Sequence, residues 1–172
     1  AAILDEAARL ATGVLAPVNR AGDLHPARLE DGVTRTSPGF AEAYRAIAEG
    51  GWIGISATSE HGGMDLPLSL ATCVNDMMAA ACLSLSLNPL MSQGQIEALE
   101  HHASDALKEL YLPKLISGEW CGTMNLTEPQ AGSDVGALTT RAVPAEDGTY
   151  RITGQKIYIT WGDNDFAENI VH

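Results

Sequence analysis

The sequence predicts an α+β protein in which an all-helical N-terminal domain precedes a β domain. Apolar residues recur at helical spacing in successive segments as far as residue 118. After Trp120, short runs of β-branched and aromatic residues alternate with turn dipeptides instead. We therefore expect a helical domain over residues 1–118 and the start of a β domain, unfinished at His172, over residues 119–172.

Five segments of the N-terminal part have the apolar spacing of helices. The first starts at Ala1 and is expected to end at Pro17, because proline interrupts a helix. A polar surface stretch over residues 21–39 follows, in which Val33 to Thr36 is the only candidate for an extended segment. The other predicted helices cover residues 40–50, 68–81, 90–101 and 105–117, and the core is expected to include Trp52, Ile53 and Ile55.

Three short strands are expected in the β domain. They are Thr139–Val143, Tyr150–Thr153 and Lys156–Thr160. The dipeptides Asp147-Gly148 and Thr153-Gly154 between these runs are typical of tight turns.

The charge balance argues against nucleic acid and anionic membranes as partners. Ten Lys and Arg stand against 22 Asp and Glu, which gives a formal net charge of −12. No run of about 20 consecutive apolar residues and no basic start followed by an apolar segment is seen, so we expect a cytoplasmic protein without an integral membrane segment.

The three cysteines have no CxxC spacing, which predicts buried thiols and no metal site.

Both ends of the chain look cut. It begins at Ala1, already inside a helical pattern, and stops at His172 directly after an apolar run. We therefore expect a fragment of a larger protein.

One loop carries the residues best suited to binding a ligand. The segment from Thr123 to Val135 combines a strand-like lead with a turn rich in hydroxyl, glycine and acidic residues. Main-chain N–H groups and hydroxyls in such a loop suit a diphosphate or the polar edge of a flavin ring. Glu128-Pro129 followed by Gly132-Ser133-Asp134 is equally typical of an ordinary β-turn.

The same loop resembles the first signature of the acyl-CoA dehydrogenase family, in the run Leu126-Thr-Glu-Pro-Gln-Ala-Gly-Ser-Asp134. Three further segments are similar to the family in order and spacing: Ser59–Gly63, Tyr111–Glu119 and Gly154–Gly162. The tail Asp163–His172 and the stretch Gly32–Gly39 look like the large subgroup that includes 3-methylmercaptopropionyl-CoA dehydrogenase. The resemblance covers the chain from the second helix to the last residue.

This resemblance implies a helical domain, a middle antiparallel β-barrel domain that is incomplete here, and a C-terminal helical bundle. It implies FAD as cofactor, an acyl-CoA substrate converted to trans-2-enoyl-CoA, electron-transferring flavoprotein as partner, and a homo-oligomer, either a dimer or a tetramer. The catalytic base of the family is a glutamate of the C-terminal domain, so no catalytic residue is expected in this chain. Glu128 and Asp134 are structural by the same match.

The resemblance also implies a set of binding residues. Ser133 matches a serine that touches the cofactor diphosphate or the acyl-CoA, while capping of the turn is an equally good role for it. Trp161 departs from the common pattern, which often has Asn or a small residue there. The residues expected to bind the cofactor are Met124, Asn125, Leu126, Thr127, Ser133, Tyr158, Ile159 and Thr160.

Two other functions are compatible with these residues. A non-catalytic assembly module would use the helices and the β extension only as contact surfaces. An acyl-CoA oxidase would share the signatures but pass its electrons to oxygen.

Overall fold

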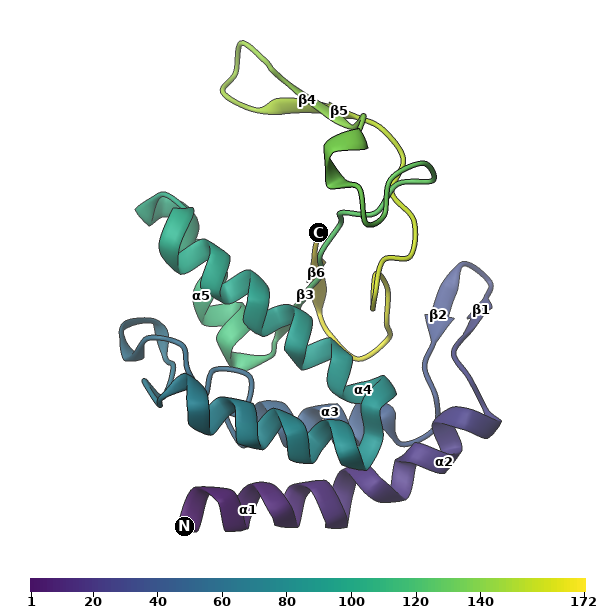
Figure 1. Cartoon of the computed structure of the whole chain (residues 1–172), viewed down its shortest axis with the longest axis vertical. Coiled ribbons are helices and arrows are strands. Elements are labelled where there is room, and N and C mark those ends of the chain that lie inside the picture. Colours follow the sequence, from purple (N-terminus) through teal and green to yellow (C-terminus); the bar gives the residue numbers. More distant parts are fainter. The chain divides into compact units, whose positions relative to one another are not determined.

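The computed structural model describes all residues, 1–172, and they form two compact units. The helical unit comprises Ala1–Thr123 and Trp161–His172, and the loop unit comprises Met124–Thr160. Helices followed by partial sheets confirm the predicted α+β class (Figure 1). The boundary expected between residues 118 and 119 concerns the domains of the whole protein and stays a prediction.

The first helical run is longer than predicted. Helix α1 (Ala2–Leu10) continues through a π-helical turn, η1 (Ala11–Leu15), into α2 (Ala16–Leu24). The prediction that Pro17 ends this run was therefore wrong. In the π-turn, Ala16 N–H donates to Ala11 O, and Pro17 then lies in the first turn of α2, where an intrahelical N–H bond is not required.

A β-hairpin occupies the polar stretch that follows. Strands β1 (Arg28–Glu30) and β2 (Val33–Arg35) pair in antiparallel fashion. Asp31 and Gly32 between them both have positive φ, +52° and +80°, as a two-residue type I′ turn requires. The extended segment at Val33 is confirmed, and the Asp-Gly dipeptide was the signal for its partner strand.

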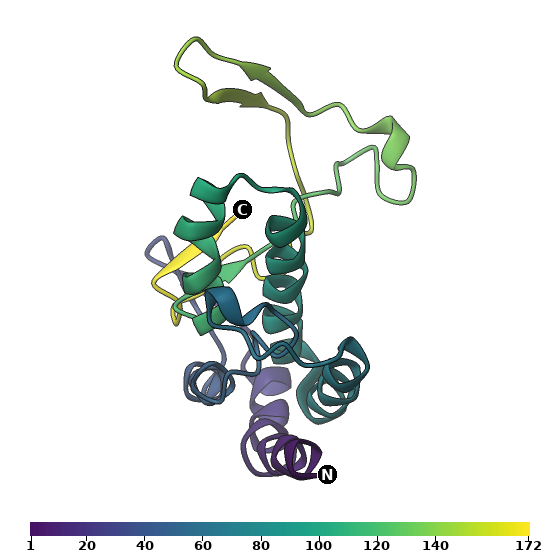
Figure 2. The ribbon, with the colours of Figure 1, turned by 90° about the vertical axis from the view of Figure 1, so that its left-hand side faces the viewer.

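Three longer helices complete the helical unit: α3 (Phe40–Glu49), α4 (Leu68–His102) and α5 (Asp105–Ser117). The two helices predicted over 68–81 and 90–101 are the arms of α4, which bends at Cys82, where φ is −154° and ψ is 85°. Figure 1 shows the two arms of α4 meeting at an angle, and Figure 2 shows several helices of this unit nearly end-on. A short 3₁₀ turn, η2 (Ser59–His61), precedes α4.

Helix α4 is long and apolar enough to cross a membrane by length and composition. Its inward side chains nevertheless belong to the protein core, among them Val74, Met78, Leu85 and Ile96. The bend at Cys82 also divides it into two shorter arms, and the helix packs on α1, α2, α5 and β3. The structure thus uses α4 as a core helix.

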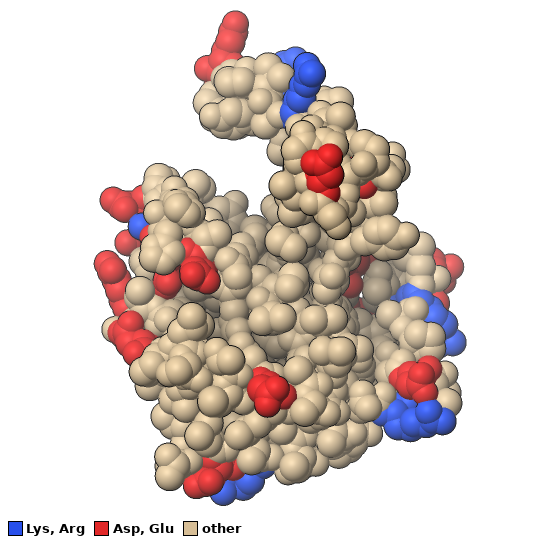
Figure 3. Space-filling view, viewed as in Figure 1, with Lys and Arg blue, Asp and Glu red and all other residues tan.

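The core of the helical unit is apolar and includes side chains from α1, α3, α4 and α5; α2 buries no residue fully, but its Val18 packs against this core. Ile47, Leu112 and Leu115 are fully buried, as are the predicted core residues Ile53 and Ile55. Two of the three cysteines are buried, but Cys73 is exposed on α4, which corrects the expectation for that thiol. In the face shown in Figure 3, acidic side chains are spread over the surface rather than gathered in one patch.

A parallel strand pair closes the helical unit. Strand β3 (Trp120–Gly122) pairs with β6 (Asn169–Val171), with Cys121 opposite Ile170. The tail therefore returns to the point at which the chain leaves this unit. A parallel pair between these segments was not predicted.

The loop unit contains one hairpin and one 3₁₀ turn, η3 (Val135–Ala137). Strands β4 (Arg141–Pro144) and β5 (Tyr150–Thr153) pair in antiparallel fashion, and every residue of both is exposed. The prediction of a third strand over residues 156–160 was wrong. Tyr158 has a φ of +55°, which a strand excludes, and β-propensity yields to such local context.

Candidate functional site

The signature loop is folded as a tight turn in the loop unit. Glu128 N–H donates to Ala131 O at 2.8 Å, and Ala131 N–H donates back to Glu128 O at 3.0 Å. Pro129 and Gln130 form the corner between them. The turn is closed before the chain reaches Ser133.

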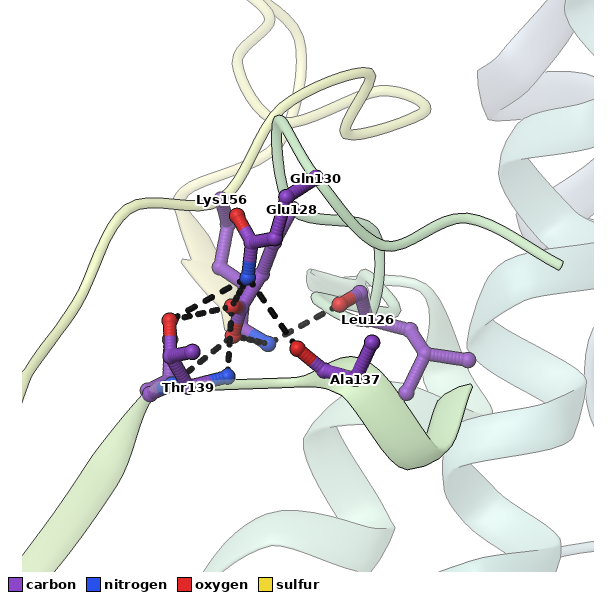
Figure 4. A network of polar contacts seen from close by, with 7 residues as sticks. Leu126, Glu128, Gln130, Ala137, Thr139 and Lys156 are labelled. Atoms are coloured by element: carbon purple, nitrogen blue, oxygen red, sulfur yellow. Dashed lines mark hydrogen bonds and ion pairs between the residues drawn. The ribbon is translucent and has the colours of Figure 1, made fainter. Parts of the chain in front are cut away.

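The side chain of Glu128 organises the surrounding chain (Figure 4). Glu128 is only 2% exposed. One carboxylate oxygen, Oε2, accepts from Thr139 N at 2.7 Å, Thr139 Oγ1 at 2.9 Å and Gln130 Nε2 at 2.6 Å. The other, Oε1, accepts from Thr140 N at 3.0 Å and Lys156 Nζ at 2.9 Å. We call these residues the Glu128 network.

These donors keep Glu128 ionised. Hydrogen bonds from Thr140 and Thr139 and the Lys156 ammonium hold the pKa of the Glu128 carboxyl well below its usual range. A carboxylate with every accessible lone pair occupied cannot accept a proton from a substrate at neutral pH. The geometry therefore gives Glu128 a structural function.

Lys156 links the two segments that the sequence analysis placed beside the ligand. Its ammonium donates both to Glu128 and to Leu126 O, the latter at 2.9 Å. Next to it, Ile157 N–H donates to Thr127 O at 2.9 Å. Residues 126–127 and 156–157 are thus held together by one main-chain bond and one lysine, without a strand ladder.

The expected binding residues are mostly accessible. Met124 is 61% exposed, Leu126 37% and Tyr158 89%. Asn125 and Ser133 are exposed, whereas Thr127, Ile159 and Thr160 are half-buried. Ser133 lies between the closed turn and η3, in the part of the loop outside the Glu128 network.

This set of side chains combines apolar surface with hydroxyl groups on the two segments. Met124, Leu126 and Tyr158 leave apolar surface exposed on both segments. Thr127 and Thr160 add hydroxyl groups to the same two segments. The carbonyl of Thr127 is already bonded to Ile157, so its N–H and hydroxyl remain as the groups suited to a ligand acceptor.

Sequence reasoning missed the residues that hold the loop together. Lys156, Thr139 and Thr140 were interpreted only as strand residues, yet all three donate to Glu128. Lys156 is the single lysine of the loop unit and stands between Gln155 and an apolar residue. A lone lysine in this position was the available signal that its ammonium pairs with a carboxylate. Nothing in the sequence indicated which carboxylate it meets.

The helical unit contains a separate cavity of about 540 Å³ between the arms of α4 and the segment before it. Asn75 and Gln93 bridge its wall, with Asn75 Nδ2 donating to Gln93 Oε1 at 2.8 Å. None of the residues expected to bind the cofactor lines this cavity. No group of three or more His, Cys, Asp or Glu side chains is placed to hold a metal ion.

Comparison with known proteins identifies relatives over the whole chain. Residues 1–119 match the model of the acyl-CoA dehydrogenase N-terminal domain. The 3-methylmercaptopropionyl-CoA dehydrogenase of Ruegeria pomeroyi is 46% identical over 171 residues, which are 99% of this chain and 29% of that protein. The chain therefore spans less than a third of the length of this relative.

Two solved structures have the same fold. A glutaryl-coenzyme A dehydrogenase in complex with glutaryl-CoA is 26% identical, with a TM-score of 0.77 over 91% of this chain and 38% of that chain. A structure of PigA with FAD and proline is 24% identical, with a TM-score of 0.75 over 91% of this chain and 39% of that chain. The second likeness concerns the fold alone.

Proposed function

Because the chain belongs to the acyl-CoA dehydrogenase family, we propose that the whole protein oxidises an acyl-CoA thioester to the trans-2-enoyl-CoA. The observation that carries the proposal is the signature loop, folded around Glu128 with most of its proposed binding residues left accessible. The relative from Ruegeria pomeroyi and the glutaryl-CoA complex both concern CoA thioesters, which supports this substrate class.

FAD is the cofactor that this function requires, and the loop unit suits it. Met124, Leu126 and Tyr158 would contact the apolar surface of the ring, and Thr127 and Thr160 would donate hydrogen bonds to its polar edge. Asn125 and Ile159 belong to the same two segments and complete the proposed contacts. When bound, the flavin supplies the acceptor for the hydride that leaves the β-carbon.

Ser133 is proposed to bind an anionic oxygen of the cofactor diphosphate or of the acyl-CoA. Its position outside the Glu128 network leaves the hydroxyl accessible to a ligand. The turn itself is closed by main-chain bonds between Glu128 and Ala131, so it does not depend on Ser133.

The chain provides no base for the α-proton in this proposal. Glu128 is the one buried carboxylate of the loop unit, and its oxygens are saturated with donors. We place the base in the C-terminal helical domain of the whole protein. Electron-transferring flavoprotein as acceptor, a homo-oligomeric state and a cytoplasmic location complete the proposal.

The test uses the whole protein. Purified protein should carry flavin, and an acyl-CoA added without oxygen should bleach the flavin absorbance. Colourless protein that does not take up added FAD would contradict the proposal and favour an assembly module. Bleaching followed by rapid oxygen consumption in air would instead identify an acyl-CoA oxidase.

A variant pair locates the cofactor on the loop. Thr127→Val removes a hydroxyl and should raise the Kd for FAD about fivefold, which corresponds to one net hydrogen bond. Thr149→Val alters a hydroxyl in the exposed β4–β5 turn and should leave the Kd unchanged. Equal Kd values for both variants would remove Thr127 from the site.

A further inference from the structure

Trp161 has contacts that its position in the sequence does not explain. It is the first residue after the loop unit, and the resemblance offered no role for an indole there. Its Nε1–H donates to Ser84 O at 2.9 Å, directly after the bend of α4 at Cys82. The indole is thereby bonded to the main chain two residues after the bend of the longest helix.

Aromatic neighbours hold the same ring from its sides. The centroid of Trp161 lies 6.2 Å from that of Phe40 and 5.5 Å from that of Phe166. Phe166 stacks in turn on the buried Tyr44 of α3 at 4.5 Å. Such pairs add to the stability given by apolar burial and restrict the orientation of the ring.

Polar contacts fix the chain that follows Trp161. Asn164 is 8% exposed, and its Oδ1 accepts from Phe166 N at 3.1 Å and Ala167 N at 2.9 Å. Asp165 accepts from Thr36 Oγ1 at 2.6 Å, which joins this segment to the end of the β1–β2 hairpin. The tail from Trp161 to Ala167 is therefore anchored within the helical unit along its length.

The main chain at Trp161 is held in an unfavourable conformation. Its φ is +54°, in the left-handed region that bulky side chains rarely adopt. Such a conformation persists only where surrounding contacts determine it. The ring contacts and the bond to Ser84 supply that constraint.

We propose that Trp161 is a positioning residue, which fixes the end of the Tyr158–Thr160 segment so that Thr160 meets the cofactor in a single orientation. The inference rests on the proposed function, because Thr160 is joined to Trp161 by a peptide bond and is one of the proposed flavin contacts. At the other end of the loop unit, Thr123 N–H donates to Val171 O at 3.0 Å, so Met124 also follows an anchored residue.

The test uses the whole protein loaded with FAD. Trp161→Phe keeps an aromatic ring but removes the N–H donor, and Trp161→Ala removes both. Trp120→Phe is the matched control, because Trp120 contacts Tyr111 and Lys114 on another side of the helical unit. The measurements are the Kd for FAD, the visible circular dichroism of the bound flavin, Tm, and amide exchange over residues 158–160.

We expect the Kd for FAD to rise about fivefold in Trp161→Phe and at least about tenfold in Trp161→Ala, because a less firmly anchored segment must be ordered when the cofactor binds. The flavin dichroism should change in both variants, whereas Trp120→Phe should leave both quantities as in the wild type. Trp161→Phe should lower Tm by no more than about 4 °C and stay folded at the assay temperature, so that a changed flavin signal reports orientation rather than unfolding. Wild-type Kd and dichroism in both Trp161 variants would overturn the inference.

The exchange measurement separates this inference from the proposed function. If the wild-type protein binds no FAD, the proposed function fails while exchange at residues 158–160 still reports on the anchor. Faster exchange in Trp161→Ala but not in Trp120→Phe would then support the positioning function. Unchanged exchange would refute it.

Discussion

The helical unit and the loop unit are stabilised by different interactions. More than twenty apolar residues are buried in the chain, and Ala131 is the only one of them that belongs to the loop unit. The loop unit instead buries Glu128 and surrounds it with donors from Thr139, Thr140 and Lys156. The stability of the helical unit thus depends on apolar surface area removed from water, and that of the loop unit on a single buried carboxylate.

This difference has consequences for how each unit responds to change. Apolar burial is non-directional and independent of pH. Because each core side chain packs against many others, truncation of one side chain weakens the contacts of many neighbours. A network around one carboxylate is directional and ionised, so its loss is local and depends on protonation. Substitutions that destabilise one unit and leave the stability of the other unchanged test this difference.

The largest effect is expected from truncation of the helical core. Ile47→Ala removes a fully buried side chain and should lower the free energy of unfolding by about 2–5 kcal/mol. Urea unfolding followed by the far-UV circular dichroism of the helices measures it. Ile3→Ala, at a partly exposed position of α1, should cost about 0.5 kcal/mol or less. Equal losses at the two positions would contradict a core-dominated helical unit.

Neutralising Glu128 should loosen the loop unit alone. Glu128→Gln removes the ionised acceptor that Lys156 and Thr139 share, so amide exchange at Thr139 and Thr140 should accelerate at least about tenfold. The helical dichroism transition should stay at the wild-type temperature. Glu146→Gln changes an exposed carboxylate in the same unit and should leave exchange unaltered. A lowered helical transition in Glu128→Gln would show that the units are not energetically separate.

Acid should reproduce this effect in the wild-type protein. The folded-state pKa of Glu128 lies below its unfolded value of about 4.3, so its contribution is complete above that pH and decreases as the pH falls below it. Exchange at Thr139, corrected for its intrinsic pH dependence, should accelerate between about pH 4 and pH 2. Glu128→Gln should lack this component, and its persistence in the variant would assign it to another group.

The smallest effect is expected from an exposed ion pair of the helical unit. Arg9 pairs with Glu6 on α1, and both side chains are more than half exposed. Arg9→Ala should change the free energy of unfolding by about 0.5 kcal/mol or less, because solvent screens such pairs. The same urea titration measures it. A loss comparable with that of Ile47→Ala would mean that surface charge, rather than burial, stabilises this unit.

Much of the helical unit followed from local pattern. The spacing of apolar residues predicted α3, α5 and both arms of α4, because a helix must present one face to the core at 3.6-residue intervals. The glycine after α5 marked its end correctly, with Gly118 at a φ of +79°. The signature run at residues 126–134, together with Ser59–Gly63, Tyr111–Glu119 and Gly154–Gly162, likewise indicated the family, and the match to known relatives bears this out.

Tertiary structure alone decided the features that join distant residues. Pro17 lies inside a continuous helical run because a π-turn precedes it, and the strand expected at 156–160 is absent because Tyr158 is held at positive φ. Glu128 and Lys156 are 28 residues apart, and no local rule predicts that they meet. Propensity and periodicity depend on neighbours within a few residues, whereas the partner of a buried charge and the ring that packs against Trp161 are chosen by the folded chain.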